Sequence, residues 1–415
     1  MAGSKWKQKT QLFEMNHLLQ TAKLQEELMA GSYKPGGGRK FVIKERGHMR
    51  YITSNTMRDK AVNHLLCDEV ITPSIKKYLA YTNSASQKDK GVSFHRKHFE
   101  EDLRHYFMQT GNNEGYVLFI DFSGYYANIQ HRPCLETLDH FIRLEQDPEV
   151  ADAAMQLVRS IFKTFEIDVS RFSDEEIEKL YRTKIDPTMN HNVPGRLLTG
   201  EKMLKKGVDI GNPISQDVGI VHPYKIDNYV SIVKGCHLTG RYTDDTHIIS
   251  ESREFLMEVL EGVKKIAAEC GIIINEKKTR IVKLKSFYRY LQIGYSLTDT
   301  GRVVKKINPK GITRERRKLK KYRKKLDEGA MTYEDIENSF KSWLGSNWKT
   351  MSKQQISNMS LLYYQLFERR PTWKRGHGRL NWLMGQPWRT SGSTGTTSSA
   401  AQKSQKEPLP GSSGR

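Results

Sequence analysis

Two adjacent carboxylates, Asp244 and Asp245, stand between a turn-like Gly240–Arg241 pair and an apolar Ile248–Ile249 run. This pattern predicts a β-hairpin that carries both acids at its tip. Like charges raise each other's pKa, so neighbouring acids are held together most readily by a cation. The usual partner is a hard divalent ion such as Mg²⁺, bound through carboxylates and substrate phosphates. For this pair alone, the alternative is a solvated turn.

A third carboxylate, Asp121, follows the apolar run Tyr116–Ile120. Such a run predicts a short strand that is covered on both faces, with the acid at its end, where a site can open. If Asp121 and the hairpin acids converge, the three carboxylates could hold two Mg²⁺ ions roughly 4 Å apart. A metal pair of this kind activates an attacking hydroxyl and stabilises a leaving oxygen. The chemistry predicted is nucleotidyl transfer.

Five motifs in a fixed order resemble those of reverse transcriptases. They correspond to the first palm motif, the motif that supports template and nucleotide, the Tyr-x-Asp-Asp motif, the next palm motif and the primer-grip hairpin. In this chain they are, in that order, Asp121–Ile129, Gly211–Gln216, Tyr242–Asp245, Gly271–Thr279 and Tyr290–Tyr295. The resemblance covers roughly residues 35 to 300.

The resemblance implies an α+β fold, a right-hand polymerase with an antiparallel palm sheet, helices packed on it, and a helical thumb. The expected parts are an N-terminal helical extension at 1–34, fingers at 35–115, a palm at 116–300 with a helical segment at 132–206, a basic helical thumb at 301–388 and a disordered tail at 389–415. The tail is rich in Ser, Gly, Thr and Pro. Whether it is native is open. Ser173 and Glu176 predict a capped helix start within the palm segment.

The resemblance also implies the roles of the metal-site residues. Asp121 and Asp244 are expected to bind both ions, with Asp245 as a weaker ligand or neighbour and the Phe122 carbonyl as an extra ligand. Mn²⁺ could replace Mg²⁺. Tyr126, five residues after Asp121, is expected to be a steric gate that excludes a 2′-hydroxyl, which makes DNA the product. The alternative is a plain core aromatic.

Four further residues are expected to contact the nucleotide. Lys44 and Arg50 lie on a basic hairpin expected to fold over the triphosphate; a basic edge strand that discourages aggregation is the alternative. Gln216 is expected to brace the templating base or the nucleotide. Lys278 is expected to donate a proton to pyrophosphate, with a plain surface lysine as the alternative.

A larger set of residues is expected to contact template or primer. From Gly301 to Leu326 the chain has thirteen Lys or Arg and one acid, which predicts a cationic helix along a duplex, or else a solvated charged face. The turn around Lys88 resembles a template loop, with a solvated loop as the alternative, and Arg58 would order the fingers or touch template. The set is Arg58, Lys88, Lys90, Gly211, Asn212, Tyr242, Leu291, Gly294, Arg314, Arg317 and Lys321.

Composition agrees with a nucleic-acid partner. The 415 residues are 37% hydrophobic, enough for a core and more than one subdomain, and the formal net charge is +21. No apolar run approaches the about 20 residues that span a membrane. We expect a cytoplasmic protein without a signal peptide or membrane partner. The four cysteines, without a Cys-x-x-Cys pair, are expected to be reduced thiols and not zinc ligands.

The function expected from these features is RNA-directed DNA synthesis. The partners would be an RNA template, a DNA product and dNTPs, with an accessory protein or a second copy also possible. The Ser215-Gln216 ending is similar to bacterial enzymes of diversity-generating retroelements and antiphage defence, whereas Asp209 and Pro213-Ile214 depart from the former. A dedicated non-coding RNA copied in defence is the favoured role. The alternatives are diversification, untemplated or protein-primed synthesis, and a non-catalytic RNA-binding scaffold.

Overall fold

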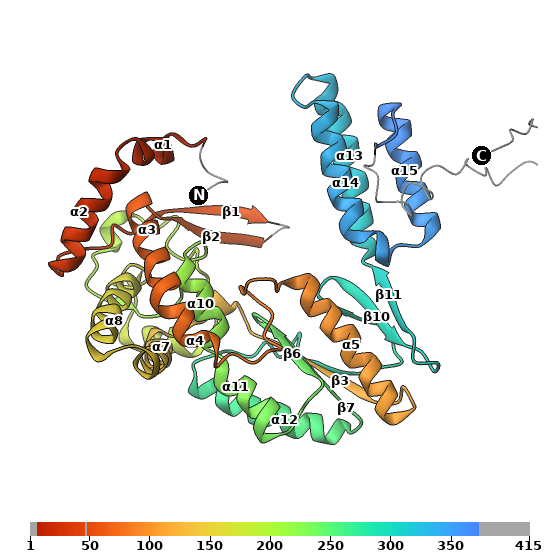
Figure 1. Ribbon diagram of the computed structural model, residues 1–415, viewed down its shortest axis with the longest axis horizontal. Coiled ribbons are helices and arrows are strands. Elements are labelled where there is room, and N and C mark those ends of the chain that lie inside the picture. Colours follow the sequence, from red (N-terminus) through yellow and green to blue (C-terminus); the bar gives the residue numbers. More distant parts are fainter. Residues whose placement is uncertain (1–5, 46–47, 373–415) are drawn as a thin grey trace, which may run out of the picture. The chain divides into compact units, whose positions relative to one another are not determined.

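The computed structural model describes residues 6–45 and 48–372 (Figure 1). The chain divides into two compact units, residues 1–306 and 307–415, and each is described by itself. The described strands lie in the first unit, except that the second unit begins at Ile307, the last residue of the final strand. The expected tail at 389–415 lies outside the described residues. No helix in the described ranges is long and apolar enough to cross a membrane.

The palm sheet has four strands in the order β6-β7-β3-β8, and every neighbouring pair is antiparallel. The strands are β3 (Tyr116–Asp121), β6 (Thr239–Tyr242), β7 (Asp245–Ser250) and β8 (Arg280–Lys283). β3 is central, and all its residues after Tyr116 are buried. A strand covered on both faces was predicted from its unbroken apolar run, and the structure confirms it.

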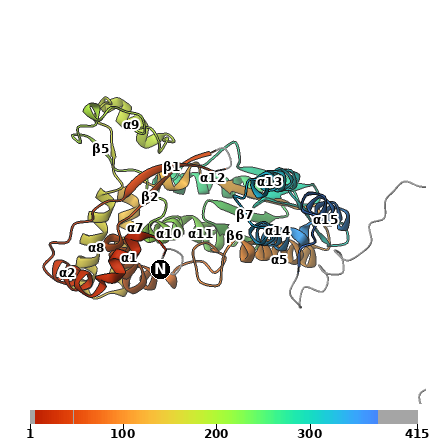
Figure 2. The same cartoon turned by 90° about the horizontal axis from the view of Figure 1, so that it is seen from above.

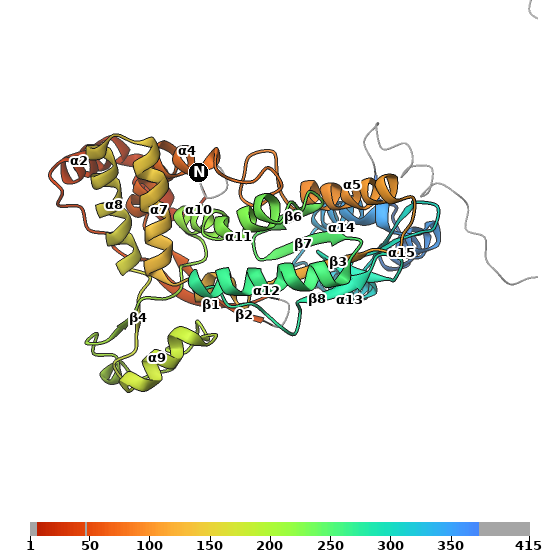
Figure 3. The ribbon, with the colours of Figure 1, turned by 90° about the horizontal axis from the view of Figure 1, so that it is seen from below.

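Alternate residues of β3 pack into different clusters, because successive side chains point to opposite faces. Leu118 and Ile120 belong to the cluster that includes α12 (Arg253–Glu269). Val117 and Phe119 belong to the cluster that includes α5 (Val92–Thr110). In Figure 3 the two helices lie along the palm strands as separate layers. This mixture of helices and antiparallel sheet is the α+β polymerase fold that the sequence predicted.

The N-terminal part of the first unit consists of one β-hairpin and several helices. β1 (Arg39–Glu45) and β2 (His48–Ser54) pair in antiparallel register, with Ile43 opposite Arg50. The helices of this part are α1 (Gln8–Met15), α2 (His17–Met29), α3 (Met57–Leu66), a π-helical turn (Cys67–Ile71) and α4 (Thr72–Lys76). The Thr56 side chain caps α3 by accepting from the Asp59 amide.

The segment between the first two palm motifs contains more than helices. α7 (His131–Glu145) and α8 (Pro148–Lys163) are followed by a small arm made of β4 (Ile167–Asp168), α9 (Asp174–Arg182) and β5 (Met203–Leu204). The arm has its own apolar cluster, with Val169, Ile185 and Leu204 at its centre. In Figures 2 and 3, α9 stands away from α7 and α8. The predicted capping box of Ser173 and Glu176 is present at the start of α9.

The first unit also contains two helices after the arm and a second sheet. α10 (Pro213–Val221) and α11 (Tyr224–Asn228) pack into the large core below the palm sheet. A second sheet, in the order β11-β10-β9, is formed by β9 (Tyr288–Tyr290), β10 (Ile293–Leu297) and β11 (Val303–Ile307). The turn between β9 and β10 places Leu291 and Gln292 at φ 44° and 72°. Both residues have the positive φ of the left-handed region, which non-glycine residues seldom adopt, so the turn is strained.

The described part of the second unit, residues 307–372, forms a bundle of three α-helices, α13 (Pro309–Asp327), α14 (Tyr333–Asn347) and α15 (Lys353–Phe367). Its core includes Phe340 and Tyr363, whose rings stack 4.8 Å apart. In α13 only Glu315 and Leu319 are buried. The cationic face of α13, which includes Arg314, Arg317 and Lys321, is exposed.

Candidate active site

The three carboxylates chosen from the sequence meet at one end of the palm sheet. Asp121 ends β3 and lies opposite Asp245, the first residue of the antiparallel β7. Asp244 occupies the turn just before β7, and its carbonyl accepts a hydrogen bond from the Phe122 amide at 3.3 Å. The register of two neighbouring strands therefore brings together acids that are more than 120 residues apart in sequence.

The acids are held in an unfavourable electrostatic environment. Burial raises the pKa of Asp244, and the Asp121 carboxylate raises it further. Burial, followed by the charges of Asp244 and Asp121, raises the pKa of Asp245 to about 7. A bound cation would reverse both effects, because it stabilises the charged carboxylates.

Two side chains from the segment after α12 donate hydrogen bonds to the carboxylate of Asp121. The Lys278 ammonium lies 2.8 Å from Oδ2, and the Asn275 amide donates to Oδ1 at 2.7 Å. The Asn275 backbone N–H also donates to the Asp121 carbonyl at 2.8 Å. Lys278 thus lies at the acids, and its action on a leaving group stays a prediction. Asn275 was not assigned a role from the sequence, although it lies in the same motif three residues before Lys278.

The donor set suits a hard divalent cation: three carboxylates from adjoining strand ends, two of them with raised pKa. A set of three side chains can hold one ion when their ligand atoms lie close together. Within the described residues, the three whose ligand atoms all lie within 4.8 Å of one another are His98, Asp102 and His247. The three aspartates do not meet that spacing. Like charges repel, and Lys278 and Asn275 occupy both oxygens of Asp121, which accounts for the wider arrangement.

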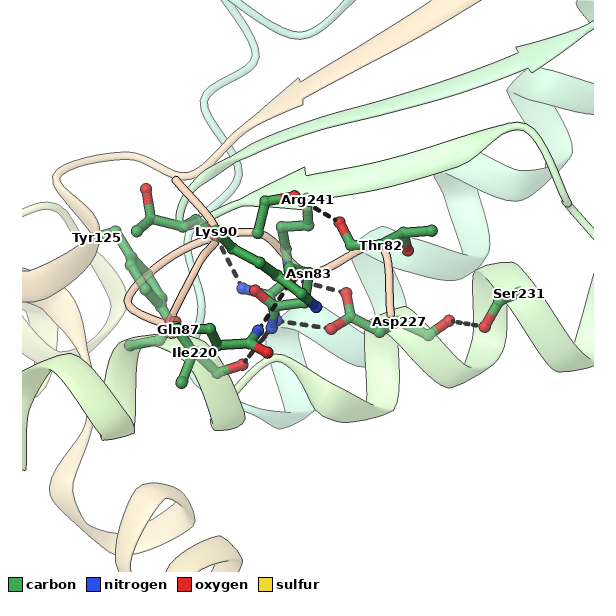
Figure 4. A network of polar contacts seen from close by, with 12 residues as sticks. Thr82, Asn83, Gln87, Lys90, Tyr125, Ile220, Asp227, Ser231 and Arg241 are labelled. Atoms are coloured by element: carbon green, nitrogen blue, oxygen red, sulfur yellow. Dashed lines mark hydrogen bonds and ion pairs between the residues drawn. The ribbon is translucent and has the colours of Figure 1, made fainter. Parts of the chain in front are cut away.

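The turn that carries Asp244 is strained and is held from below by a buried ion pair (Figure 4). Thr243 has φ 54°, which is rare for a β-branched residue. The Arg241 guanidinium donates to the Thr243 carbonyl at 3.0 Å and to the Ile220 carbonyl at 2.7 Å. It also forms a bidentate pair with Asp227, at 2.8 and 2.6 Å. Arg241 is 2% exposed, so this pair is shielded from water.

The loop that contains Lys90 belongs to the same network (Figure 4). The Arg241 amide donates to the Thr82 carbonyl, and the Asn83 side chain donates to the Ile220 carbonyl at 3.0 Å. The Lys90 ammonium donates to the carbonyls of Tyr81 and Asn83, at 2.8 and 3.2 Å, and burial lowers its pKa. Lys90 therefore stabilises the loop. A template contact by Lys90 stays a prediction, as it does for the exposed Lys88.

A second polar network lies under the β6–β7 hairpin that carries Asp244 and Asp245. The Tyr290 hydroxyl donates to the Asp245 carbonyl at 3.3 Å and lies 2.7 Å from His95 Nε2. His247 Nε2 lies 2.8 Å from the Asp102 carboxylate, and all these side chains are buried. Sequence reasoning missed this network, because its histidines are scattered and resemble ordinary core residues.

Helix α5, which carries His95, also contacts the turn between β9 and β10, where a primer contact stays a prediction. Arg96, which follows His95 on α5, donates through Nε to the Leu291 carbonyl at 3.1 Å. At Gly294 on β10, a Cβ would lie 2.2 Å from the Phe287 ring, so a larger residue there would have to displace that ring. α5 therefore connects the strained turn at Leu291 to the hairpin that carries the acids.

A cavity of about 660 Å³ opens beside the carboxylates. Its lining includes Asp244, Tyr242, Tyr126, Arg50 and the segment Gly207–Ile210. Burial, and then the charge of Asp244, raise the pKa of Tyr126 to about 12. The expected steric gate thus stands at the cavity that adjoins the acids.

Other predicted site residues are placed as follows. Lys44 is exposed on β1, and Gln216 is exposed on α10. Asn212 is 2% exposed and caps α10 by accepting from the Ile214 amide at 3.0 Å. Gly211 has φ 108°, and a Cβ there would lie 3.1 Å from the Thr53 carbonyl.

Arg58 lies on α3 and forms a bidentate ion pair with Glu27 of α2. Of the two roles expected for Arg58, ordering the fingers agrees with this contact. Asp209, which departs from the common motif, lines the cavity, and burial raises its pKa. All four cysteines are buried and free.

An antiparallel palm sheet with acids at adjoining strand ends is typical of nucleic-acid polymerases. Residues 40–295 match the family model described as reverse transcriptase (RNA-dependent DNA polymerase). The match takes in more than half of the chain, which belongs to this family. The protein is an RNA-directed DNA polymerase, a nucleotidyltransferase.

Among curated proteins, none matches the chain. Solved structures that are similar include telomerase from Candida albicans in complex with a fragment of telomeric RNA, at 11% identity and a TM-score of 0.47, over 89% of this chain and 67% of that one. Another is apo telomerase from Candida tropicalis truncated from its C-terminal domain, at 12% identity and a TM-score of 0.42, over 70% of this chain and 60% of that one.

Proposed function

We propose that this reverse transcriptase works by two-metal nucleotidyl transfer at Asp121, Asp244 and Asp245. The observation that carries the proposal is the register of Asp121 opposite Asp245, beside a cavity lined by Asp244 and Tyr126. Mg²⁺, or Mn²⁺ in its place, would be held by the three carboxylates with the Phe122 carbonyl as an extra ligand. When bound, the ions supply activation of the primer hydroxyl and neutralisation of the leaving group.

The chain's own groups then position the substrate. The Tyr126 ring lies at the cavity next to Asp244, where a bulky side chain leaves no room for a 2′-hydroxyl. Lys278, 2.8 Å from Asp121, is close enough to the acids to give a proton to the departing pyrophosphate. Arg50 and Lys44 on the β1–β2 hairpin would contact the triphosphate, and Gln216 would brace the templating base or the nucleotide.

Template and primer would be bound mainly through phosphates. The exposed cations of α13, namely Arg314, Arg317 and Lys321, suit a duplex backbone. Gly211, Asn212 and Tyr242 would support the template strand, and the Leu291–Gly294 hairpin would hold the primer. The domain boundaries are proposed as fingers at 35–115, palm at 116–300 and thumb at 301–388.

The proposed biological role is the copying of a dedicated non-coding RNA in the cytoplasm of a bacterium, as part of antiphage defence. The Ser215–Gln216 ending supports this role, and Asp209 separates the chain from the usual diversity-generating form. RNA that copurifies with the protein identifies the template when sequenced. One structured transcript supports the proposal, whereas a repeat that adjoins a variable target gene supports diversification.

The site assignment is tested by primer extension on an RNA template. The variant with Asp244→Ala and Asp245→Ala should make no DNA and still bind RNA, because its fold and cationic surfaces are unchanged. Asp299→Ala, an exposed acid outside the cavity, is the matched control and should extend primers normally. DNA synthesis by the double variant would overturn the assignment.

A further inference from the structure

The arm between α8 and α10 was assigned no chemistry from the sequence, yet it supplies a cation to the active-site cavity. Lys184, just after α9, lines the cavity together with Asp244 and Tyr126. Its aliphatic stem lies over the turn that follows Asp121, since a Cβ at Gly124 would be 3.0 Å from Lys184 Cε. The ammonium group therefore lies near the turn that follows Asp121, inside the cavity that adjoins the acids.

The backbone on both sides of Lys184 is anchored. The Ile185 amide donates to Asn128 Oδ1 at 2.9 Å, and the Asn128 amide donates in turn to the Gly124 carbonyl at 2.9 Å. Asn128 is 2% exposed and joins the arm directly to the turn after Asp121. A residue on an anchored backbone can present a charge at a defined place, although its own side chain is exposed.

A buried lysine strengthens this anchor. The Lys206 ammonium donates to the carbonyls of Leu180, Tyr181 and Thr183, at 2.8, 3.1 and 2.8 Å. These carbonyls end α9, where a cation is favourable. Lys206 is fully buried, and burial lowers its pKa to about 8. The residue directly before Lys184 is thus fixed as firmly as the one directly after it.

Within the described part of the chain, the Lys184 ammonium group forms no hydrogen bond and no ion pair. By contrast, the Lys40 ammonium in the same cavity donates to the Thr164 carbonyl at 3.3 Å. The nearby acid Asp168 is also engaged, because its oxygens accept from Ser170 and Gly200. A lysine that stays unpaired beside a cluster of acids is suited to an anion that enters with the substrate.

We infer that Lys184 binds the phosphates of the incoming nucleoside triphosphate, and that the arm is a part of the nucleotide site. This inference rests on the proposed function, which puts the nucleotide in this cavity. Lys184 is a binding residue in this account and takes no part in proton transfer. A template phosphate is the competing ligand, and the experiment separates the two.

The experiment compares Lys184→Ala and Lys184→Arg with Lys179→Ala, an exposed lysine of α9 outside the cavity. The first readout is the KM for dNTP on an RNA template with a DNA primer. The second is the Kd of the same dNTP for a complex whose primer ends in a 3′-deoxynucleotide, which needs no catalysis. The third is the Kd of the template–primer without nucleotide.

Lys184→Ala should raise the dNTP KM and Kd by about tenfold, as expected for the loss of one charge-assisted contact. Lys184→Arg and Lys179→Ala should stay near the wild type, and template–primer affinity should not change. An unchanged dNTP Kd in Lys184→Ala overturns the inference. So does weaker template–primer binding with an unchanged dNTP Kd, which would mark a template contact. A wild-type protein that binds dNTP but fails to extend primers would instead count against the proposed function.

Discussion

Arg241 donates a hydrogen bond to the carbonyl of Thr243 at 3.0 Å, and this contact supports the one strained residue of the catalytic turn. The guanidinium is planar and has donors on several sides. It can therefore reach the turn, the Ile220 carbonyl and both oxygens of Asp227 at once. The position of Asp244 thus depends on an ion pair that lies beneath it and outside the lining of the cavity.

Removal of this support should be costly. Arg241→Ala leaves the carboxylate of Asp227, whose side chain is 11% exposed, without its partner, and it also leaves the Thr243 and Ile220 carbonyls without their donor, so the free energy of unfolding should fall by about 3 kcal/mol. Chemical denaturation measures the change. The matched control is Lys264→Ala, which breaks an exposed ion pair with Glu261 and should cost about 1 kcal/mol or less. A similar, small loss in both variants would contradict the structural role of Arg241.

The stability of the protein should also fall with rising pH because of Asp217. This acid is 7% exposed on α10 and accepts a hydrogen bond from Thr72 at 3.1 Å. Burial raises its pKa from 3.8 to about 6. Between these values the unfolded chain releases the proton first, so the unfolded state is favoured as pH rises from about 4 to 6. The loss is complete above the folded pKa and is on the order of 3 kcal/mol at most.

Asp217→Asn tests this expectation, since asparagine keeps the shape and an acceptor but cannot ionise. Unfolding curves measured from pH 4 to 8 should show that the variant gains stability over the wild type as pH rises, with a plateau above pH 6. Equal pH dependence in the two proteins would show that Asp217 does not titrate in this range.

Tyr126 should determine which sugar enters the cavity. Tyr126→Ala opens space beside Asp244, so ribonucleotide incorporation should rise relative to deoxyribonucleotide incorporation by at least tenfold, in line with the about 1–3 kcal/mol that one steric contact contributes to selectivity. The ratio of kcat/KM for the two nucleotides measures it. Tyr125→Phe removes a buried hydroxyl that donates to the Gly219 carbonyl, and it should leave the ratio unchanged. Unaltered sugar selectivity in Tyr126→Ala would remove its role as a gate.

The sequence predicted the fold class and the meeting of Asp121 with the Asp244–Asp245 pair. The fold class followed from the resemblance of five ordered motifs, whereas the strand before Asp121 and the hairpin of Asp244 and Asp245 followed from local signals, namely an apolar run and a turn. It did not predict the Arg241–Asp227 pair or the contact of Tyr290 with Asp245. Those contacts depend on how α5, α11 and the two sheets pack against one another. The spacing of residues along the sequence does not predict that packing.

In the arm, too, local structure was predicted from the sequence and the place of one side chain in the cavity was not. Helical patterns predicted its capped helix at Ser173, and the capping box is present. Nothing in the pattern around Lys184 distinguished it from any other surface lysine. Its place in the cavity follows from Asn128 and Lys206, which bind the backbone on either side of it.

The most direct test of the central claim is single-nucleotide extension of a DNA primer on an RNA template by Asp121→Asn, with Mg²⁺ in excess. Asparagine keeps the size of the side chain and a hydrogen bond to Asn275, but it removes one of the three negative charges that would hold the metal ions. The account predicts no detectable extension by Asp121→Asn and normal extension by Asp299→Asn. Extension at the wild-type rate by Asp121→Asn would contradict it.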